Sequence, residues 1–183
     1  NIMKKSLEEL NRISNEDFKK AEKLPLIVVL DNIRSRHNVG SIFRTADAFR
    51  VSDIYLCGIT DTPPNKEIEK TALGSTESVD WKYFETTVEA INTLKKNKYL
   101  IAGIEQSHNS IDISEINIEN SEHQLAIILG NEVFGMSDEV LPLCDFIIEL
   151  PQHGTKHSLN VSVCAGIVIW DIYRRMISTY QYF

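Results

Sequence analysis

Short runs of apolar residues, many of them β-branched, alternate with helical patterns along this chain, and no other feature constrains its fold as strongly. Each run is too short for a helix and predicts a buried strand. The predicted strands are Leu26–Leu30, Ile54–Cys57, Val79–Phe84, Tyr99–Ile104, Gln124–Leu129 and Phe146–Leu150. The predicted helices are Ser6–Lys23, Val39–Arg50, Ile68–Leu73, Val88–Lys96, Ser137–Leu143 and Ser158–Met176. This order predicts an α/β fold with a mainly parallel sheet flanked by helices.

Length and composition restrict the class of protein further. The chain has 183 residues, of which 43% are hydrophobic and 25% are charged, the balance of a globular protein rather than of a disordered or collagen-like chain. We expect an N-terminal helix in residues 1–23 and a single domain over residues 24–183. The longest apolar runs, Leu24–Leu30 and Leu125–Gly130, are far shorter than the ~20 residues that cross a bilayer, so we expect no transmembrane segment.

The cysteines indicate the compartment. Cys57, Cys144 and Cys164 are far apart and form no C-x-x-C pair, which favours buried, reduced thiols. The N-terminal residues also lack the apolar core of a signal peptide. We therefore expect a cytoplasmic protein.

The distribution of charge matters more than its sum. A net charge of −7 disfavours non-specific binding to nucleic acid, because phosphate contacts need Lys and Arg. However, Asn32–Arg44 contains three arginines and no acid, and Pro151–Ala165 contains Lys156 and two histidines and no acid. These two stretches leave room for a small site that binds a polyanion.

In parallel sheets, ligands bind beyond the carboxyl ends of the strands, and the first candidate segment lies at such an end. Asp31–Gly40, which leads into Phe43–Ala46, follows a strand and opens a helix. The free N–H groups and the dipole of a helix N-terminus favour phosphate or carboxylate. Alternatively, Asn38 only caps the helix and Arg44 is solvated on its outer face.

The second candidate segment, Gly130–Ser137, nearly matches the phosphate-binding loop G-x-x-x-x-G-K-[ST]. Met136 stands where the lysine is required, so the pattern argues against an NTPase. The alternative is a turn between a strand and a helix with Ser137 as the N-cap, which leaves Glu132 unexplained. The chain contains no G-x-G and no G-x-S-x-G, which excludes the usual dinucleotide fingerprint and hydrolase elbow.

The third candidate segment, Leu150–Ser162, separates a predicted strand from the most apolar helix. Ser158 is a suitable N-cap for that helix, whereas Asn160 and Ser162 are poor helix formers in its first turn and must have some other role there. The two histidines of this segment have no neighbouring carboxylate or cysteine, so we expect no metal site.

Together the three segments resemble the SPOUT superfamily and, within it, the TrmH-like RNA ribose 2′-O-methyltransferases. The resemblance rests on N-V-G…F-R-T-A-D-A-F, then G-N-E-x-x-G, then L-P-x-x-G-x-x-x-S-L-N-V-S, where the family has I-P in place of Leu150-Pro151. It extends from about Leu26 to Arg174. It implies an RNA substrate, either tRNA or rRNA.

The resemblance also implies a fold detail, a cofactor and an assembly. It implies a deep trefoil knot in the C-terminal part of the α/β domain and S-adenosylmethionine bound in that knot. By position, the cofactor contacts are Gly103, Ile104, Gly130, Leu150 and Leu159. Gly130 suits this role because a residue without Cβ lets a ligand approach the backbone closely. The family is homodimeric with its pocket near the subunit interface, and the apolar helix Val161–Ile172 would suit such packing.

The family's functional positions correspond to Asn38, Arg44, Glu132, Ser158 and Asn160, all with the expected residue. The implied reaction is in-line transfer of a methyl group to a ribose 2′-hydroxyl. We expect a charged Arg44 to clamp the adjacent phosphate and orient the hydroxyl, with Asn38 and Ser158 positioning the ribose or Arg44. We expect Glu132 and Asn160 to hold the loops of the pocket and the knot in place.

Two other hypotheses belong to different classes of function. The first is a dimeric RNA-binding protein that keeps the fold and has lost turnover; cofactor binding without methyl transfer would favour it. The second is an unrelated nucleotide-binding α/β enzyme, which rests only on Gly130–Gly135; ATP binding unaffected by S-adenosylmethionine would support it.

Overall fold

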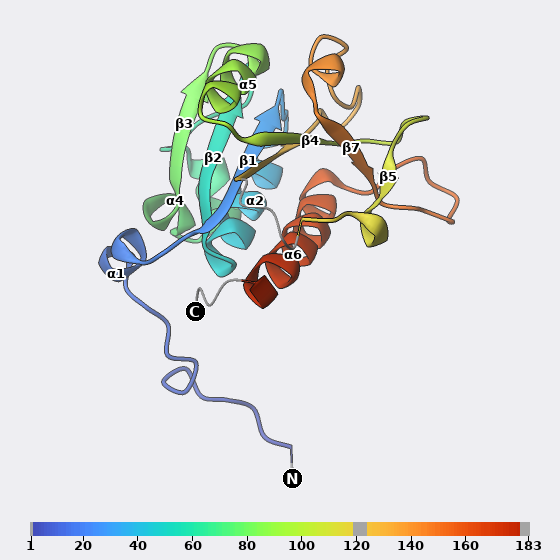
Figure 1. The fold of residues 1–183 in the computed structure, drawn as a ribbon. Coiled ribbons are helices and arrows are strands. Elements are labelled where there is room, and N and C mark those ends of the chain that lie inside the picture. The colour runs from blue at the N-terminus through green and yellow to red at the C-terminus, as the bar shows by residue number, and fades with distance from the viewer. Residues whose placement is uncertain (1, 119–123, 180–183) are drawn as a thin grey trace.

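A computed structural model describes residues 2–118 and 124–179, and seven strands within them form one sheet in the order β3-β2-β1-β6-β4-β7-β5 (Figure 1). Every strand pair is parallel. The strands are β1 (Leu24–Asp31), β2 (Val51–Cys57), β3 (Asp80–Phe84), β4 (Leu100–Ile104), β5 (Ile111–Asp112), β6 (Leu125–Leu129) and β7 (Phe146–Glu149). The helices are α1 (Asn15–Lys20), α2 (Arg36–Ala48), α3 (Lys66–Ala72), α4 (Ser75–Ser78), α5 (Thr87–Lys96) and α6 (Val161–Thr179), with short 3₁₀ helices η1 (Ile113–Glu115) and η2 (Leu141–Leu143). The predicted α/β fold is confirmed.

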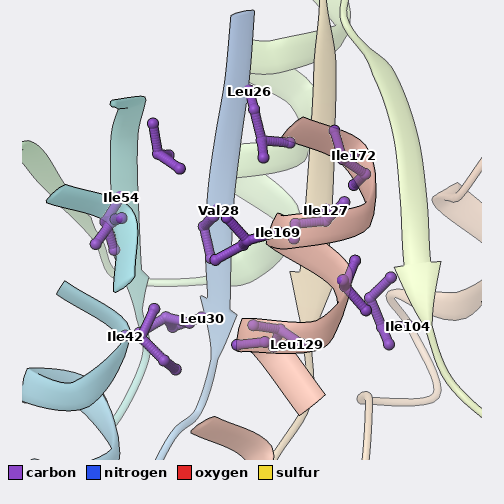
Figure 2. Close-up of a cluster of buried hydrophobic side chains, with 14 of the residues drawn as sticks. Leu26, Val28, Leu30, Ile42, Ile54, Ile104, Ile127, Leu129, Ile169 and Ile172 are labelled. Carbon is purple, nitrogen blue, oxygen red and sulfur yellow. The ribbon is translucent and has the colours of Figure 1, made fainter. Parts of the chain in front are cut away.

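Helices cover both faces of the sheet, which explains why β1 is apolar without alternation. Val28 and its neighbours on one face of β1 pack with α2 and α6, whereas Ile27 and its neighbours on the other face pack with α5. Figure 2 shows the first cluster, in which Ile42 of α2 and Ile169 of α6 lie against the strands. Burial of this apolar surface, at about 25 cal/mol per Å², is the main stabilising contribution to the fold.

The carboxyl ends of β1, β6, β4 and β7 lie side by side at one edge of the sheet. The register pairs Leu30 with Leu129, Leu129 with Ile104, and Ile104 with Ile148. The chain segments that follow these four strands therefore emerge together. These are the segments in which the sequence predicts functional residues.

The N-terminal region differs from the prediction. Residues 6–23 do not form one helix: α1 begins at Asn15, after Ser14, whose side chain accepts a hydrogen bond from the Asp17 N–H (3.1 Å). Phe18 joins the core, while Leu7 is exposed on a segment that leads away from the body of the molecule (Figure 1). A helix without a packed apolar face is only marginally stable, so helix forms where Phe18 gives it a packed face.

The predicted helix Ser137–Leu143 is also wrong. Turns occupy its first part and η2 the last. Pro142 lacks a backbone N–H, and the Ser137 N–H is bonded to the Asp31 carboxylate (2.8 Å), so Ser137 anchors a loop rather than capping a helix. The trefoil knot and the division at residues 23 and 24 stay predictions.

Candidate active site

A cavity of about 480 Å³ lies at the carboxyl ends of β4 and β6 and beside the segment that follows β7. Most of the predicted site residues line it: Ile104, Gly130, Glu132, Leu150, Ser158 and Leu159. Its charged side chains are the acids Glu105, Glu132 and Asp138, and within the described part of the chain no Lys or Arg lines it. The cavity therefore favours a cation over an anion.

The loop after β6 folds back on itself to form one wall of the cavity. Asn131 and Gly135 exchange two backbone hydrogen bonds of 2.9 Å, and the Asn131 side chain accepts from the backbone N–H groups of Val133 (2.8 Å) and Phe134 (3.1 Å). A Cβ on Gly130 would lie 2.3 Å from the carbonyl carbon of Gly135. Glycine is therefore required at 130 by the returning backbone, which corrects the expectation that a ligand imposes it.

Two carboxylates that were not predicted to be site residues hold this loop in place. Asp31, fully buried at the end of β1, accepts from the Ser137 N–H (2.8 Å) and from the Thr87 hydroxyl (2.6 Å). Glu105, directly after β4, accepts from the Met136 N–H (3.1 Å). Both lie at the ends of strands that were predicted to carry the site. Their position at these strand ends, and not a sequence motif, could therefore have identified them.

Gly130→Ala should destabilise the protein by about 1–3 kcal/mol, the usual range for overpacking a well-packed site. The added methyl group meets backbone atoms at 2.3 Å, and backbone cannot rotate away. Urea denaturation measures the change. Gly154→Ala is the matched control, because a Cβ at Gly154 meets nothing within 4 Å. Equal stability of the two variants would contradict this packing.

Hydrogen bonds join the three sequence motifs through Glu132, Asn38 and Asn160. The Glu132 carboxylate accepts from the backbone N–H groups of Arg34 and Ser35 (2.9 Å each) and from the Asn38 side-chain amide (3.0 Å). The Asn38 side-chain oxygen in turn accepts from the Asn160 amide (3.2 Å). Residues that are far apart in the sequence thus fix the relative positions of three loops.

The environment of Glu132 suits an anchor better than a base. Partial burial raises the pKa of Glu132, but the hydrogen bonds from Asn38, Arg34 and Ser35 outweigh burial and lower the pKa overall. Both carboxylate oxygens are already accepting hydrogen bonds. A carboxylate with a lowered pKa and occupied oxygens is a poor proton acceptor.

This lowered pKa predicts a pH-dependent contribution to stability. Because the pKa falls on folding, the stabilisation by Glu132 is full above the unfolded pKa and is lost as the pH falls through the folded one. Glu132→Gln should lower the free energy of unfolding by about 1–2 kcal/mol near pH 7, allowing for partial exposure to water. The difference from the wild type should shrink below about pH 4.3. Urea titrations at several pH values measure it, and a pH-independent difference would contradict a role for the charge.

The start of α6 corrects the role predicted for Ser158. The helix begins at Val161, and the Asn160 side-chain oxygen accepts from the N–H groups of Ser162 (2.9 Å) and Val163 (3.3 Å). Asn160, and not Ser158, is therefore the N-cap, which explains a poor helix former at this position. Ser158 remains exposed and lines the cavity.

Gly103 and Arg44 lie outside the cavity lining. A Cβ on Gly103 would lie 2.7 Å from the Ile147 side chain and 2.9 Å from that of Met136, so Gly103 allows these side chains to pack closely against β4. Arg44 is exposed and forms no hydrogen bond or ion pair with any described residue. It lies in a separate hollow with Phe49 and Lys70.

Comparison with known proteins decides the family. The model of the SpoU rRNA methylase family matches residues 25–170 of this chain. The chain belongs to the SpoU rRNA methylase family. The resemblance inferred from the motifs is thereby confirmed.

Relatives in sequence and in structure agree with this family. A Staphylococcus saprophyticus protein named as a TrmH family tRNA/rRNA methyltransferase is 33% identical over 157 residues, which are 86% of this chain and 61% of that protein. The chain thus spans about three fifths of the length of such relatives. The TrmH/SpoU tRNA modifying enzyme of A. aeolicus has a TM-score of 0.79 and 28% identity, covering 92% of this chain and 83% of that one. An AdoMet-bound rRNA methyltransferase from Sinorhizobium meliloti has a TM-score of 0.77 and 26% identity, covering 86% and 59%.

Two further features concern the binding of metal ions and the crossing of membranes. Within residues 2–118 and 124–179, no group of three or more His, Cys, Asp or Glu side chains is placed to hold a metal ion. In the same described residues, no helix is both long enough and apolar enough to span a bilayer.

Proposed function

We propose that this chain is an S-adenosylmethionine-dependent methyltransferase that methylates a ribose 2′-hydroxyl of tRNA or rRNA. The observation that carries the proposal is that residues of the second and third motifs line one acidic cavity, while Asn38 of the first motif is hydrogen-bonded to Glu132 and Asn160. All three cysteines are free thiols, which fits our placing of the enzyme in the cytoplasm.

The chemistry of the cavity fits S-adenosylmethionine. That cofactor carries its transferable methyl group on a positively charged sulfur. The acids Glu105, Glu132 and Asp138 line the cavity and complement a cation. Apolar side chains, among them Leu129 and Leu141, offer a surface for the adenine ring.

The residues that would hold this cofactor are Ile104, Gly130, Leu150 and Leu159, which line the cavity, with Gly103 packed against Met136 of the same lining. Arg44 would hold the phosphate beside the target ribose and orient its 2′-hydroxyl. Asn38 and Ser158 would position the ribose or Arg44, while Glu132 and Asn160 would keep the loops in place. Methylation at the 2′-hydroxyl restricts the substrate to RNA.

We further propose that the enzyme is a homodimer with the cavity near the subunit interface. Val163, Ile167 and Trp170 recur at helical spacing on α6 and are exposed large hydrophobic side chains. Contiguous exposed apolar surface of this kind marks an interaction site. Phe49, whose ring lies 5.6 Å from that of Trp170, also lines the hollow that holds Arg44. Packing through α6 would therefore bring a second copy close to Arg44.

Transfer of labelled methyl groups from S-adenosylmethionine to purified tRNA and rRNA pools tests the proposed activity. Label in one pool, resistant to alkali as a 2′-O-methyl linkage is, would identify both the reaction and the substrate class. Cofactor binding without transfer to either pool would favour the dimeric RNA-binding protein that has lost turnover. ATP binding unaffected by S-adenosylmethionine would instead favour the nucleotide-binding enzyme.

A further inference from the structure

An aromatic ring stands exposed at the mouth of the cavity. Phe134 is among the lining residues, and the residue is 86% exposed. A residue that lines the cavity and is this exposed lies at the rim, with most of its surface in water. Aromatic residues are enriched where proteins contact ligands and partners, so an exposed phenylalanine beside a cavity points to such a contact.

The backbone beneath this ring is held rigidly. The Asn131 side chain accepts from the N–H groups of Val133 and Phe134, and the paired hydrogen bonds between Asn131 and Gly135 close the loop. Gly135 adopts a φ of 70°, which favours glycine, and the next N–H is bonded to Glu105. A preorganised ring loses little conformational entropy when it binds.

The negative charge of the cavity lining limits which ligands can bind at the rim. The acids that line the cavity repel phosphate, and no described Lys or Arg of the lining offsets them. A nucleic acid that reaches this mouth therefore needs a contact that does not depend on charge. Stacking of a base on an aromatic face is such a contact.

The loop that precedes α2 offers positive charge to the phosphate backbone of a nucleic acid. Glu132, two residues before Phe134, accepts from the N–H of Arg34, whose side chain is exposed in the acid-free stretch that opens α2. A ribonucleotide lying between the two loops would bring its base toward the ring and its phosphate toward this cationic stretch. A cofactor held inside the cavity would leave the outer part of the ring in water.

We propose that Phe134 stacks on a nucleobase of the RNA substrate, next to the ribose that receives the methyl group. This inference rests on the proposed function and adds to it the contact that selects an unpaired base at the mouth. Double-stranded RNA hides the faces of its bases in the helix, so the substrate must present a nucleotide that is unstacked or in a loop.

The test replaces the aromatic face while keeping apolar bulk. Phe134→Leu should weaken binding of the labelled tRNA or rRNA pool, whichever the wild type binds, by about 5- to 100-fold. It should raise the KM for that RNA with little change in kcat, since the contact is made before and during the reaction. Phe134→Trp should bind RNA within about threefold of the wild type, because it restores a face for stacking. Leu7→Ala, which changes an apolar residue equally exposed at 86% and outside the cavity lining, is the matched control and should stay within about twofold.

Two further readouts separate stacking on RNA from a role of the ring in cofactor binding or in dimerisation. The ratio of wild-type to Phe134→Leu affinity should stay constant between low and high salt, because loss of a ring releases no counterions. Calorimetry should give the same affinity for S-adenosylmethionine in both proteins. Weaker cofactor binding would assign the ring to the cofactor, and dissociation of a dimer in Phe134→Leu would assign it to a second copy; either result overturns the proposal.

These measurements also distinguish the failure of this inference from that of the proposed function. If the wild type transfers methyl groups and Phe134→Leu has an unchanged KM for RNA, the stacking is wrong and the function stands. If the wild type binds RNA without transferring methyl groups and Phe134→Leu loses that binding, the contact stands and the activity is wrong. If the wild type binds neither RNA pool, both are wrong.

Discussion

Arg44→Ala is expected to lower kcat/KM for methyl transfer by about 10²- to 10³-fold, the range found when one positioned group that stabilises a transition state is removed. The affinity for S-adenosylmethionine should stay within a few-fold. Both expectations follow from the position of Arg44, which is exposed on α2, outside the cavity lining and without a described hydrogen-bond or ion-pair partner. Its guanidinium is therefore available to an RNA phosphate and does not hold the fold together. Initial rates with the labelled RNA pool and calorimetry with the cofactor measure the two effects.

A second cation in the hollow around Arg44 offers a control for Arg44→Ala. Lys70 lies in the same hollow, but its ammonium is paired with Glu67 (2.8 Å). Lys70→Ala should therefore leave kcat/KM within about twofold, because an exposed ion pair contributes little. Arg44→Lys should recover only part of the activity, since a lysine keeps the charge and lacks the planar fork that binds phosphate in two places. Loss of cofactor binding or of thermal stability in Arg44→Ala would show that Arg44 is structural and contradict this role.

Elements that are specified by local pattern were predictable, and elements that depend on a distant partner were not. β1 and β6 were predicted because a strand buried on both faces is apolar throughout, whatever lies around it. The two-residue strand β5 was missed because its pairing with β7, and not its own pattern, makes it a strand. The N-terminal helix was predicted too long because an amphipathic pattern does not reveal whether the body of the protein offers a surface to cover it.

The candidate site divides in the same way. The motif residues Glu132, Asn38 and Asn160 could be selected from the sequence, and the structure brings them together. Asp31 was not selected, because its function is to accept from Ser137, which lies 106 residues later in the chain. Gly103 was assigned to the cofactor by position, whereas only the fold reveals Met136 packed against it. Long-range contacts of this kind leave no local trace in the sequence.

Arg175 carries the last expected result, because its buried guanidinium joins α6 to the segment that follows β5. Its side chain is 8% exposed, and it donates to the Asp171 carboxylate (2.7 Å) and to the backbone carbonyls of Ile116 (3.0 Å) and Ile113 (3.1 Å). Arg175→Met should lower the free energy of unfolding by about 3–5 kcal/mol, because removing one partner of a buried charged network leaves the others unsatisfied. For a chain of this length the change corresponds to a fall of roughly 6–20 °C in Tm.

Arg174→Ala is the control for Arg175→Met, because Arg174 bonds to the same Asp171 carboxylate (2.9 Å) from a side chain that is 50% exposed. It should change the stability by about 0–1 kcal/mol. Thermal and urea denaturation followed by circular dichroism compare the two variants. Similar stabilities would mean that the carbonyls of residues 113–116 find other donors. A large difference would show that the buried clamp, and not the exposed ion pair, stabilises the fold. The segment that the clamp holds follows β5, β5 pairs with β7, and β7 leads to Leu150 in the cavity lining, so α6 would then support one side of the cavity through these contacts.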